Sequence, residues 1–235
     1  MKLCVIPVRS GSKGLPNKNI HPFLGRPLLS HSVSQALTSG VFDVIAVSSD
    51  SGHYLDIARA AGATCLIERP AELASDTATS LDALRHAVTQ AEARLATECV
   101  TATILQATSP IREPEHIKAA LRKLETADEA RNLVSVTPTK DGPWSTLVTS
   151  QEEWARRLPM AQVEILRRQD APILHRINGS IYVWRRDALW SAEPLIGPRT
   201  LIHEMPQLYS IDIDTLDDLR IAEFVATQLL GWPSG

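Results

Sequence analysis

The sequence contains few cysteines and no long apolar run. Its three cysteines, Cys4, Cys65 and Cys99, are far apart and odd in number, which is typical of free thiols in a reducing compartment rather than of a disulfide framework. Neither they nor the seven histidines show zinc-ligand spacing. No stretch approaches the roughly 18 apolar residues of a membrane span, and the apolar run at the N-terminus is too short for a secretory signal. We therefore expect a cytoplasmic protein that does not contact a membrane.

The sequence also lacks a strong charge of either sign. The net charge is -3 and the sequence pI is about 6.2, so no overall field would attract nucleic acid, and we expect no nucleic-acid partner. Any anion site has to come from a local cluster of cations. With 44% hydrophobic and 22% charged residues, the composition is that of an ordinary globular protein. We expect residues 1–235 to form a single domain.

Short apolar runs alternate along the chain with segments of helical periodicity. The predicted strands are 3–8, 43–50, 63–68, 100–106 and 132–138, then 178–186, 201–206 and a short one within 210–214. The predicted helices are 27–40, 53–62, 80–96, 113–127 and one at the C-terminal end. This alternation predicts an α/β fold with an open, mostly parallel sheet flanked by helices.

Polar segments follow four of these strands: RSGSKG, SSD, RP and QATSP. Ligands of open α/β sheets bind beyond the carboxyl ends of the strands. The four segments are therefore predicted to converge on one edge of the sheet and to form a site there.

The segment IPVRSGSKGLPNKN, residues 6–19, is the first candidate for anion binding. Its glycines allow sharp turns that present backbone N–H groups, while Arg9 and Lys13 add positive charge. The spacing matches neither a P-loop nor a three-glycine dinucleotide fingerprint. A phosphate cradle and an ordinary solvated basic loop both fit the segment.

The segment SIDIDT, residues 210–215, is a candidate for metal binding. Residues two apart in a strand point the same way, about 6.6–6.8 Å apart, so Asp212 and Asp214 would share a face. Mg²⁺ favours one or two carboxylates together with substrate phosphate oxygens. The alternative is a pair of carboxylates that caps the next helix. Two further polar segments, RPAELASDTATS (69–80) and LQATSPIR (105–112), could each be a plain loop.

Taken together, IPVRSGSKGLPNKNI, RPAELASDTATSLDAL, LQATSPIR, RRQD, NGSIYV and SIDIDT occur in the order and rough spacing of one family. The chain resembles the CMP-sialate synthetases, or acylneuraminate cytidylyltransferases, over nearly its whole length, including their relatives that act on legionaminate. The resemblance implies a Rossmann-like nucleotidyltransferase fold and Mg²⁺-dependent transfer of CMP from CTP to the anomeric hydroxyl of a nonulosonic acid, with release of pyrophosphate.

The resemblance also assigns residues to the nucleotide. Arg9, Ser12 and Lys13 match positions that hold the CTP phosphates, and Asn19 matches the residue that recognises cytosine. Arg69 and Ser80 match positions near the base and the ribose. Metal ion and basic residues stabilise the leaving pyrophosphate, so the resemblance gives a catalytic set: Arg9, Lys13, Asp212 and Asp214.

For the acid sugar, the resemblance assigns Gln106, Arg168, Arg176 and Tyr182, and for Mg²⁺ it assigns Asp212 and Asp214. The segment of about 139–175 resembles an excursion that packs against a second subunit, so the resemblance implies a homodimer.

Some residues depart from the family pattern. Ala107 replaces the usual proline of QPTSP, and Ser145 stands where some relatives carry a lysine that the nearby Lys140 could replace. Leu195 and Ile196 occupy positions of paired aromatic residues in some relatives. The changes at 145, 195 and 196 bear on the acceptor pocket, so the cytidylyl donor is better supported than the acid sugar.

Other functions remain open at this point. The acceptor could be another acidic molecule, such as an octulosonate or a phosphonate. The chain could also be a non-catalytic nucleotide-binding relative, although the pair Asp212 and Asp214 argues against this. The missing three-glycine fingerprint argues against an NAD-dependent Rossmann enzyme.

Overall fold

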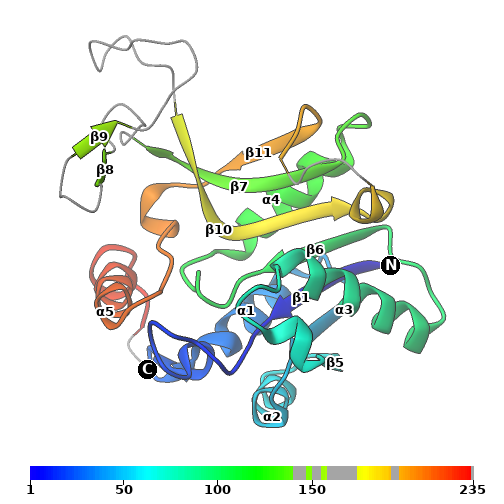
Figure 1. Ribbon diagram of the computed structural model, residues 1–235, viewed down its shortest axis with the longest axis horizontal. Helices are drawn as coiled ribbons and strands as arrows, with labels where there is room; N and C mark the ends of the chain where they lie inside the picture. Colours follow the sequence, from blue (N-terminus) through cyan, green and yellow to red (C-terminus); the bar gives the residue numbers. More distant parts are fainter. Residues whose placement is uncertain (140–146, 150–154, 158–173, 192–195, 234–235) are drawn as a thin grey trace.

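Seven strands of this chain form one sheet, in the order β11-β7-β10-β6-β1-β4-β5 (Figure 1). The computed structural model describes residues 1–139, 147–149, 155–157, 174–191 and 196–233. The strands of the sheet are β1 (Lys2–Pro7), β4 (Val44–Ser49), β5 (Cys65–Glu68), β6 (Thr101–Leu105), β7 (Asn132–Thr139), β10 (Leu174–Arg185) and β11 (Thr200–Glu204). Two small antiparallel pairs are β2 (Pro22–Phe23) with β3 (Arg26–Pro27), and β8 (Leu147–Thr149) with β9 (Ala155–Arg157).

Strand β10 is the only antiparallel member of the described sheet. It pairs antiparallel with β6 on one side and with β7 on the other, whereas β1 with β4, β1 with β6, β4 with β5 and β11 with β7 are parallel. The prediction of an open, mostly parallel sheet is confirmed. The insertion of β10 between β6 and β7 was not predicted.

In the described part of the chain, five α-helices flank the sheet: α1 (Leu28–Ser39), α2 (Gly52–Ala60), α3 (Ser80–Leu95), α4 (Pro114–Glu125) and α5 (Leu216–Phe224). Apolar residues of α1, α2 and α4 form one buried cluster with the sheet, and those of α3 form a second. In β1, Cys4 and Ile6 belong to the first cluster, while Leu3 and Val5 belong to the second. Because alternate residues of a strand face opposite sides, β1 is buried on both faces, as expected of a central parallel strand.

A third buried cluster lies at the edge of the sheet and includes α5. It joins Leu15 of the N-terminal loop, Phe23, Ile213 and the buried face of α5. Figure 1 shows α5 beside the N-terminal loop, with the C-terminal end of the chain close by. This cluster therefore fixes the loop of residues 6–19 against the segment that carries Asp212 and Asp214.

The prediction of a short strand within 210–214 is wrong. Residues 211–214 have an irregular conformation outside any strand, with a backbone hydrogen bond from the Ile213 nitrogen to the Thr108 oxygen at 2.8 Å. Ile213 is nevertheless fully buried and Asp212 and Asp214 are exposed. The expected alternation is kept even though no neighbouring strand pairs with the segment.

The helix ends follow from local sequence. Thr79 caps α3 and Thr215 caps α5, each in a reciprocal hydrogen-bonded box with an aspartate three residues on, Asp82 and Asp218. Gly40 ends α1 with a φ of 64°, which a glycine adopts without strain. The helix limits predicted from the sequence are therefore close to those observed.

The segment of about 139–175, which the resemblance assigns to a subunit contact, lies mostly outside the described residues. Its described parts are residue 139, β8, β9 and residues 174–175. Within the described ranges, no helix has the length and apolar character needed to cross a membrane. The three cysteines are buried and free.

Candidate active site

A cavity of about 390 Å³ lies beyond the carboxyl ends of β1, β5 and β6. Its walls come from three polar segments that were predicted to converge: the N-terminal loop, the segment after β5 and the segment after β6. The predicted site residues that line it are Arg9, Ser12, Lys13, Asn19, Arg69, Ser80, Gln106 and Asp214. The convergence on one edge of the sheet is thus observed.

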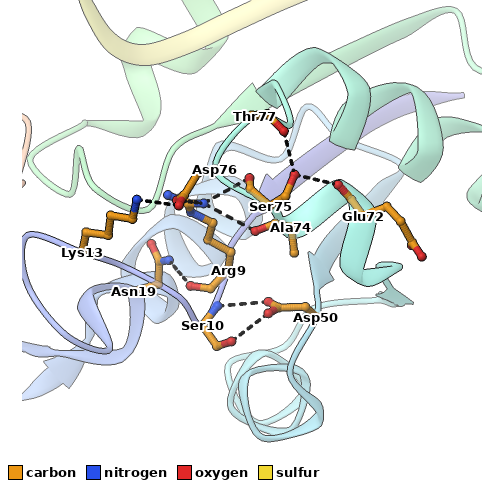
Figure 2. Close-up of polar contacts among 10 residues, drawn as sticks. All are labelled: Arg9, Ser10, Lys13, Asn19, Asp50, Glu72, Ala74, Ser75, Asp76 and Thr77. Carbon is orange, nitrogen blue, oxygen red and sulfur yellow. Dashed lines mark hydrogen bonds and ion pairs between the residues drawn. The ribbon is translucent and has the colours of Figure 1, made fainter.

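Arg9 and Lys13 both contact one carboxylate in this cavity, that of Asp76. The Arg9 guanidinium lies 2.9 Å from one Asp76 oxygen and the Lys13 ammonium lies 2.6 Å from the other (Figure 2). The hydrogen bonds from Lys13 and Arg9 lower the pKa of Asp76. Asp76 was not singled out in the sequence, although it lies within RPAELASDTATS.

The N-terminal loop is held by side chains from elsewhere in the fold. Asp50, just after β4, accepts hydrogen bonds from the backbone nitrogen of Ser10 at 3.0 Å and from its hydroxyl at 2.7 Å. The buried Asn19 donates its Nδ2 to the Arg9 carbonyl oxygen at 2.9 Å. This donor is therefore occupied within the loop, and the Oδ1 acceptor of Asn19 remains for a ligand in the cavity.

Arg69 lies on the floor of the cavity and is largely buried. Its Nη2 donates to the Val8 carbonyl oxygen, whereas its buried Nε has no partner among the described residues. Burial lowers the pKa of this guanidinium, although an arginine stays charged at neutral pH. Across the cavity, the Gln106 amide donates to the Ser80 hydroxyl at 3.3 Å. Gln106, which the resemblance assigned to the acid sugar, therefore lines this first cavity.

Asp214 lies where the first cavity adjoins a second one of about 550 Å³. Its carboxylate pairs with the Lys18 ammonium at 2.6 Å, and both residues line the first cavity. Asp212 lines the second cavity with Arg176 and Gln207. Lys18 belongs to the quoted N-terminal loop but was not singled out, because its partner is 196 positions away.

The environment of Asp212 favours a bound cation. Loss of hydration around the carboxyl group raises its pKa even though the residue as a whole is exposed, and the negative charge of Asp214 raises it further, against a hydrogen bond from Thr108. No group of three or more potential metal ligands occurs among the described residues. Two carboxylates that repel each other fit Mg²⁺, because that ion commonly completes its shell with water and phosphate oxygens.

The residues assigned to the acid sugar separate in the structure. Arg176 is exposed in the second cavity, where its guanidinium donates to the Ser210 carbonyl oxygen at 3.4 Å. Tyr182 lines neither cavity and stacks on Trp184, with ring centroids 5.9 Å apart. Arg168 lies outside the described residues, as do Lys140, Ser145 and Leu195. Ile196 is 47% exposed.

A fully buried arginine lies behind the wall of the first cavity and contacts Gln106, which lines it. Arg112 donates to the Ser180 carbonyl oxygen at 2.8 Å, to the Ser32 hydroxyl at 2.8 Å and to the Gln106 carbonyl oxygen at 3.5 Å. Ser180 lies where the pairing of β10 with β7 shifts register. There, Gly179 has a φ of 76° and lies against the Asp212 carboxylate. Arg112 ends the motif LQATSPIR, so its position was visible in the sequence and its burial was not.

Comparisons with known proteins agree with this architecture. The chain matches the family described as Cytidylyltransferase over residues 3–216. It is 34% identical over 218 residues to an N-acylneuraminate cytidylyltransferase of Streptococcus agalactiae, covering 92% of this chain and 51% of that protein. The chain thus spans about half the length of this curated relative.

Two further similarities cover nearly the whole length of both proteins. A CMP-N,N'-diacetyllegionaminic acid synthase of Campylobacter jejuni is 32% identical over 223 residues, which is 95% of this chain and 94% of that one. A solved structure of a CMP:2-keto-3-deoxy-manno-octonic acid synthetase complexed with CTP superposes with a TM-score of 0.71 at 19% identity. It covers 97% of this chain and 99% of that chain, and it has the same fold.

Proposed function

The chain belongs to the cytidylyltransferase family, and on this basis we propose that it transfers CMP from CTP to the anomeric hydroxyl of a nonulosonic acid and releases pyrophosphate. The observation that carries the proposal is the junction of two cavities at Asp214, one lined by cations and the other containing Arg176. This arrangement can hold a nucleoside triphosphate and an acidic acceptor side by side.

The first cavity suits CTP. Four cationic side chains line it, two acidic ones face them, and a triphosphate carries about four negative charges that such a set can bind. The cations are Arg9, Lys13, Lys18 and Arg69, and the acids are Asp76 and Asp214. We assign the Asn19 Oδ1 to the cytosine amino group and the Ser80 hydroxyl to the ribose.

The reaction then needs mainly positioning and charge neutralisation. The anomeric oxygen forms a bond to the α-phosphorus and its hydroxyl proton is released to solvent. The bond from that phosphorus to the α,β-bridging oxygen breaks, and this oxygen leaves as part of pyrophosphate. We propose that Arg9 and Lys13 offset the charge that develops on the pyrophosphate. Mg²⁺ held by Asp212 and Asp214 would supply further charge neutralisation and orient the phosphate oxygens.

The second cavity supports an acceptor that carries a carboxylate. Arg176 is exposed there and makes a long hydrogen bond to the protein at 3.4 Å, so its guanidinium can turn to a carboxylate ligand. Named relatives act on N-acylneuraminate or on diacetyllegionaminate. We place the acceptor among the nonulosonic acids and leave its stereochemistry to experiment.

A pyrophosphate-release assay with CTP and Mg²⁺ tests the proposed function. The acceptor panel consists of N-acetylneuraminate, a legionaminate, a pseudaminate, an octulosonate and a phosphonate. We expect turnover with at least one nonulosonate. Turnover with the octulosonate or phosphonate alone would move the acceptor to another class, and CTP binding without turnover of any acceptor would favour a non-catalytic relative.

Replacing Arg176 by glutamine should raise the KM for the acid sugar about tenfold, because the substitution removes a charged partner of its carboxylate. The dissociation constant for CTP should stay within twofold, since Arg176 does not line the nucleotide cavity. Steady-state kinetics and equilibrium CTP binding separate the two effects. Arg59→Gln, on the exposed surface of α2, is the matched control, and an equal KM for both variants would contradict the assignment.

We further propose that residues 1–235 act as one catalytic domain in a homodimer. The family match over residues 3–216 supports the single domain, and the resemblance of the segment of about 139–175 to a subunit-contact excursion supports the dimer. A second subunit would then cover the exposed side of the acceptor cavity.

A further inference from the structure

The carboxylate of Asp76 occupies the position between the two cations assigned to the triphosphate. Figure 2 shows the Asp76 carboxylate at the tips of the Arg9 and Lys13 side chains, which both come from the N-terminal loop. Each oxygen contacts a different cation, at 2.9 Å and 2.6 Å. A phosphate group with two of its oxygens in these places would make the same contacts.

The same stretch of chain also contacts the Nη1 atom of Arg9 through two backbone carbonyl oxygens. Its Nη1 lies 3.2 Å from the Ser75 carbonyl oxygen and 3.4 Å from that of Ala74, in addition to the Asp76 carboxylate. The guanidinium is therefore drawn toward residues 74–76 in the nucleotide-free protein. A phosphate oxygen that binds at Nη1 has to compete with these contacts.

The Asp76 side chain has few contacts apart from those with the two cations. Its side chain is 49% exposed, and within the described residues it makes no other side-chain hydrogen bond. It lies between the short 3-10 helix at Ala71–Ala74 and the cap of α3 at Thr79. Because the cap is satisfied by Asp82, movement of residues 75–78 leaves α3 intact.

We propose that Asp76 is an internal competitor of the triphosphate, a latch that pairs with Arg9 and Lys13 until the nucleotide takes them and that returns to them as pyrophosphate leaves. The proposal rests on the proposed function, because it takes Arg9 and Lys13 as phosphate ligands. Removing a residue that binds the nucleotide or supports the loop weakens nucleotide binding. Removing Asp76 should instead strengthen it.

The size of the effect follows from the exposure of the pairs. An exposed ion pair changes an equilibrium constant by a factor of about 1.4 to 5. Two such contacts together correspond to a factor of about 2 to 25, and we expect Asp76→Asn to bind CTP and pyrophosphate about three- to tenfold more tightly than the wild type, within that range. Pyrophosphate should also dissociate more slowly from the variant by a similar factor.

Isothermal titration calorimetry with CTP and with pyrophosphate, each without metal ion, measures these affinities on the full chain. The matched control is Glu72→Gln, which removes the same charge from the same segment. Figure 2 shows the Glu72 side chain directed away from Arg9, so this variant should bind both ligands within about twofold of the wild type. Asp76→Ala, which removes the remaining hydrogen-bonding group, should strengthen binding as Asp76→Asn does.

The outcomes distinguish a wrong role for Asp76 from a wrong proposed function. Equal or weaker binding by Asp76→Asn and Asp76→Ala, with a folded protein by circular dichroism, overturns the latch while wild-type CTP binding still supports the proposed function. Equal strengthening by Glu72→Gln also overturns it, because the effect would then come from net charge alone. If the wild type binds neither ligand, the proposed function fails and the latch with it.

Discussion

Asp212→Asn and Asp214→Asn should each lower kcat/KM for CMP transfer by about 10²- to 10⁴-fold, because each substitution removes a carboxylate proposed to bind Mg²⁺. The side chain keeps its volume and loses its charge. The two variants should differ in detail. Asp214→Asn also removes the partner of Lys18, and it relieves the repulsion that raises the pKa of Asp212.

The measurement is pyrophosphate release as a function of Mg²⁺ concentration. Both variants should need more Mg²⁺ for half-maximal rate than the wild type. Asp217→Asn is the control, because Asp217 lies in the same part of the chain and pairs with Arg220 on the exposed side of α5. Wild-type activity in both variants would show that the metal assignment is wrong.

Replacing Gly14 by alanine should lower kcat/KM about 100-fold. A Cβ at Gly14 would lie 2.6 Å from the backbone oxygen of Asp214, a distance that real contacts do not allow. The obstructing atom belongs to the backbone, so rotation of a side chain cannot relieve the contact. The loop has to move away from the carboxylates, and displacements of about 1 Å in an active site can cost 100-fold in rate.

Gly11→Ala provides the control for this substitution. Gly11 lies in the same loop, and a Cβ there would meet nothing within 4 Å. It should keep activity within about threefold of the wild type. A comparison of melting temperatures then separates a displaced loop from a destabilised protein, and a fully active, folded Gly14→Ala would contradict the close approach.

The helices and most strands could be predicted because their signals are local. Capping residues and apolar periodicity fix the limits of α3 within a few positions, and Thr215 marks the start of α5. The neighbours of a strand are not encoded locally, which is why the insertion of β10 between β6 and β7 was missed. Residues 210–214 have the alternating pattern of a strand and yet no partner strand. Burial of a side chain also depends on distant parts of the chain. Leu95 continues the apolar face of α3 and is nevertheless 44% exposed.

The site was predictable to the extent that its residues follow strands. Arg9, Arg69 and Gln106 come after β1, β5 and β6, and the geometry of a parallel sheet brings such positions together. The partners of these residues could not be read from the sequence. Asp76 is 67 positions from Arg9, and the contacts that bury Arg112 involve residues up to 80 positions away.

The position of β10 between β6 and β7 determines the order in which strands can pair while the chain is synthesised. Strands β1, β4, β5 and β6 are complete by residue 105 and can pair as soon as they leave the ribosome. Strand β7 finds its sheet neighbours only in β10 and β11, which are made later. We therefore expect β7 to be unpaired until β10 and β11 are made, and unpaired strand edges make folding intermediates prone to aggregate. Asp212 and Asp214 emerge after both strands, so a growing chain carries the cations Arg9, Lys13, Lys18 and Arg69 well before it carries these two carboxylates.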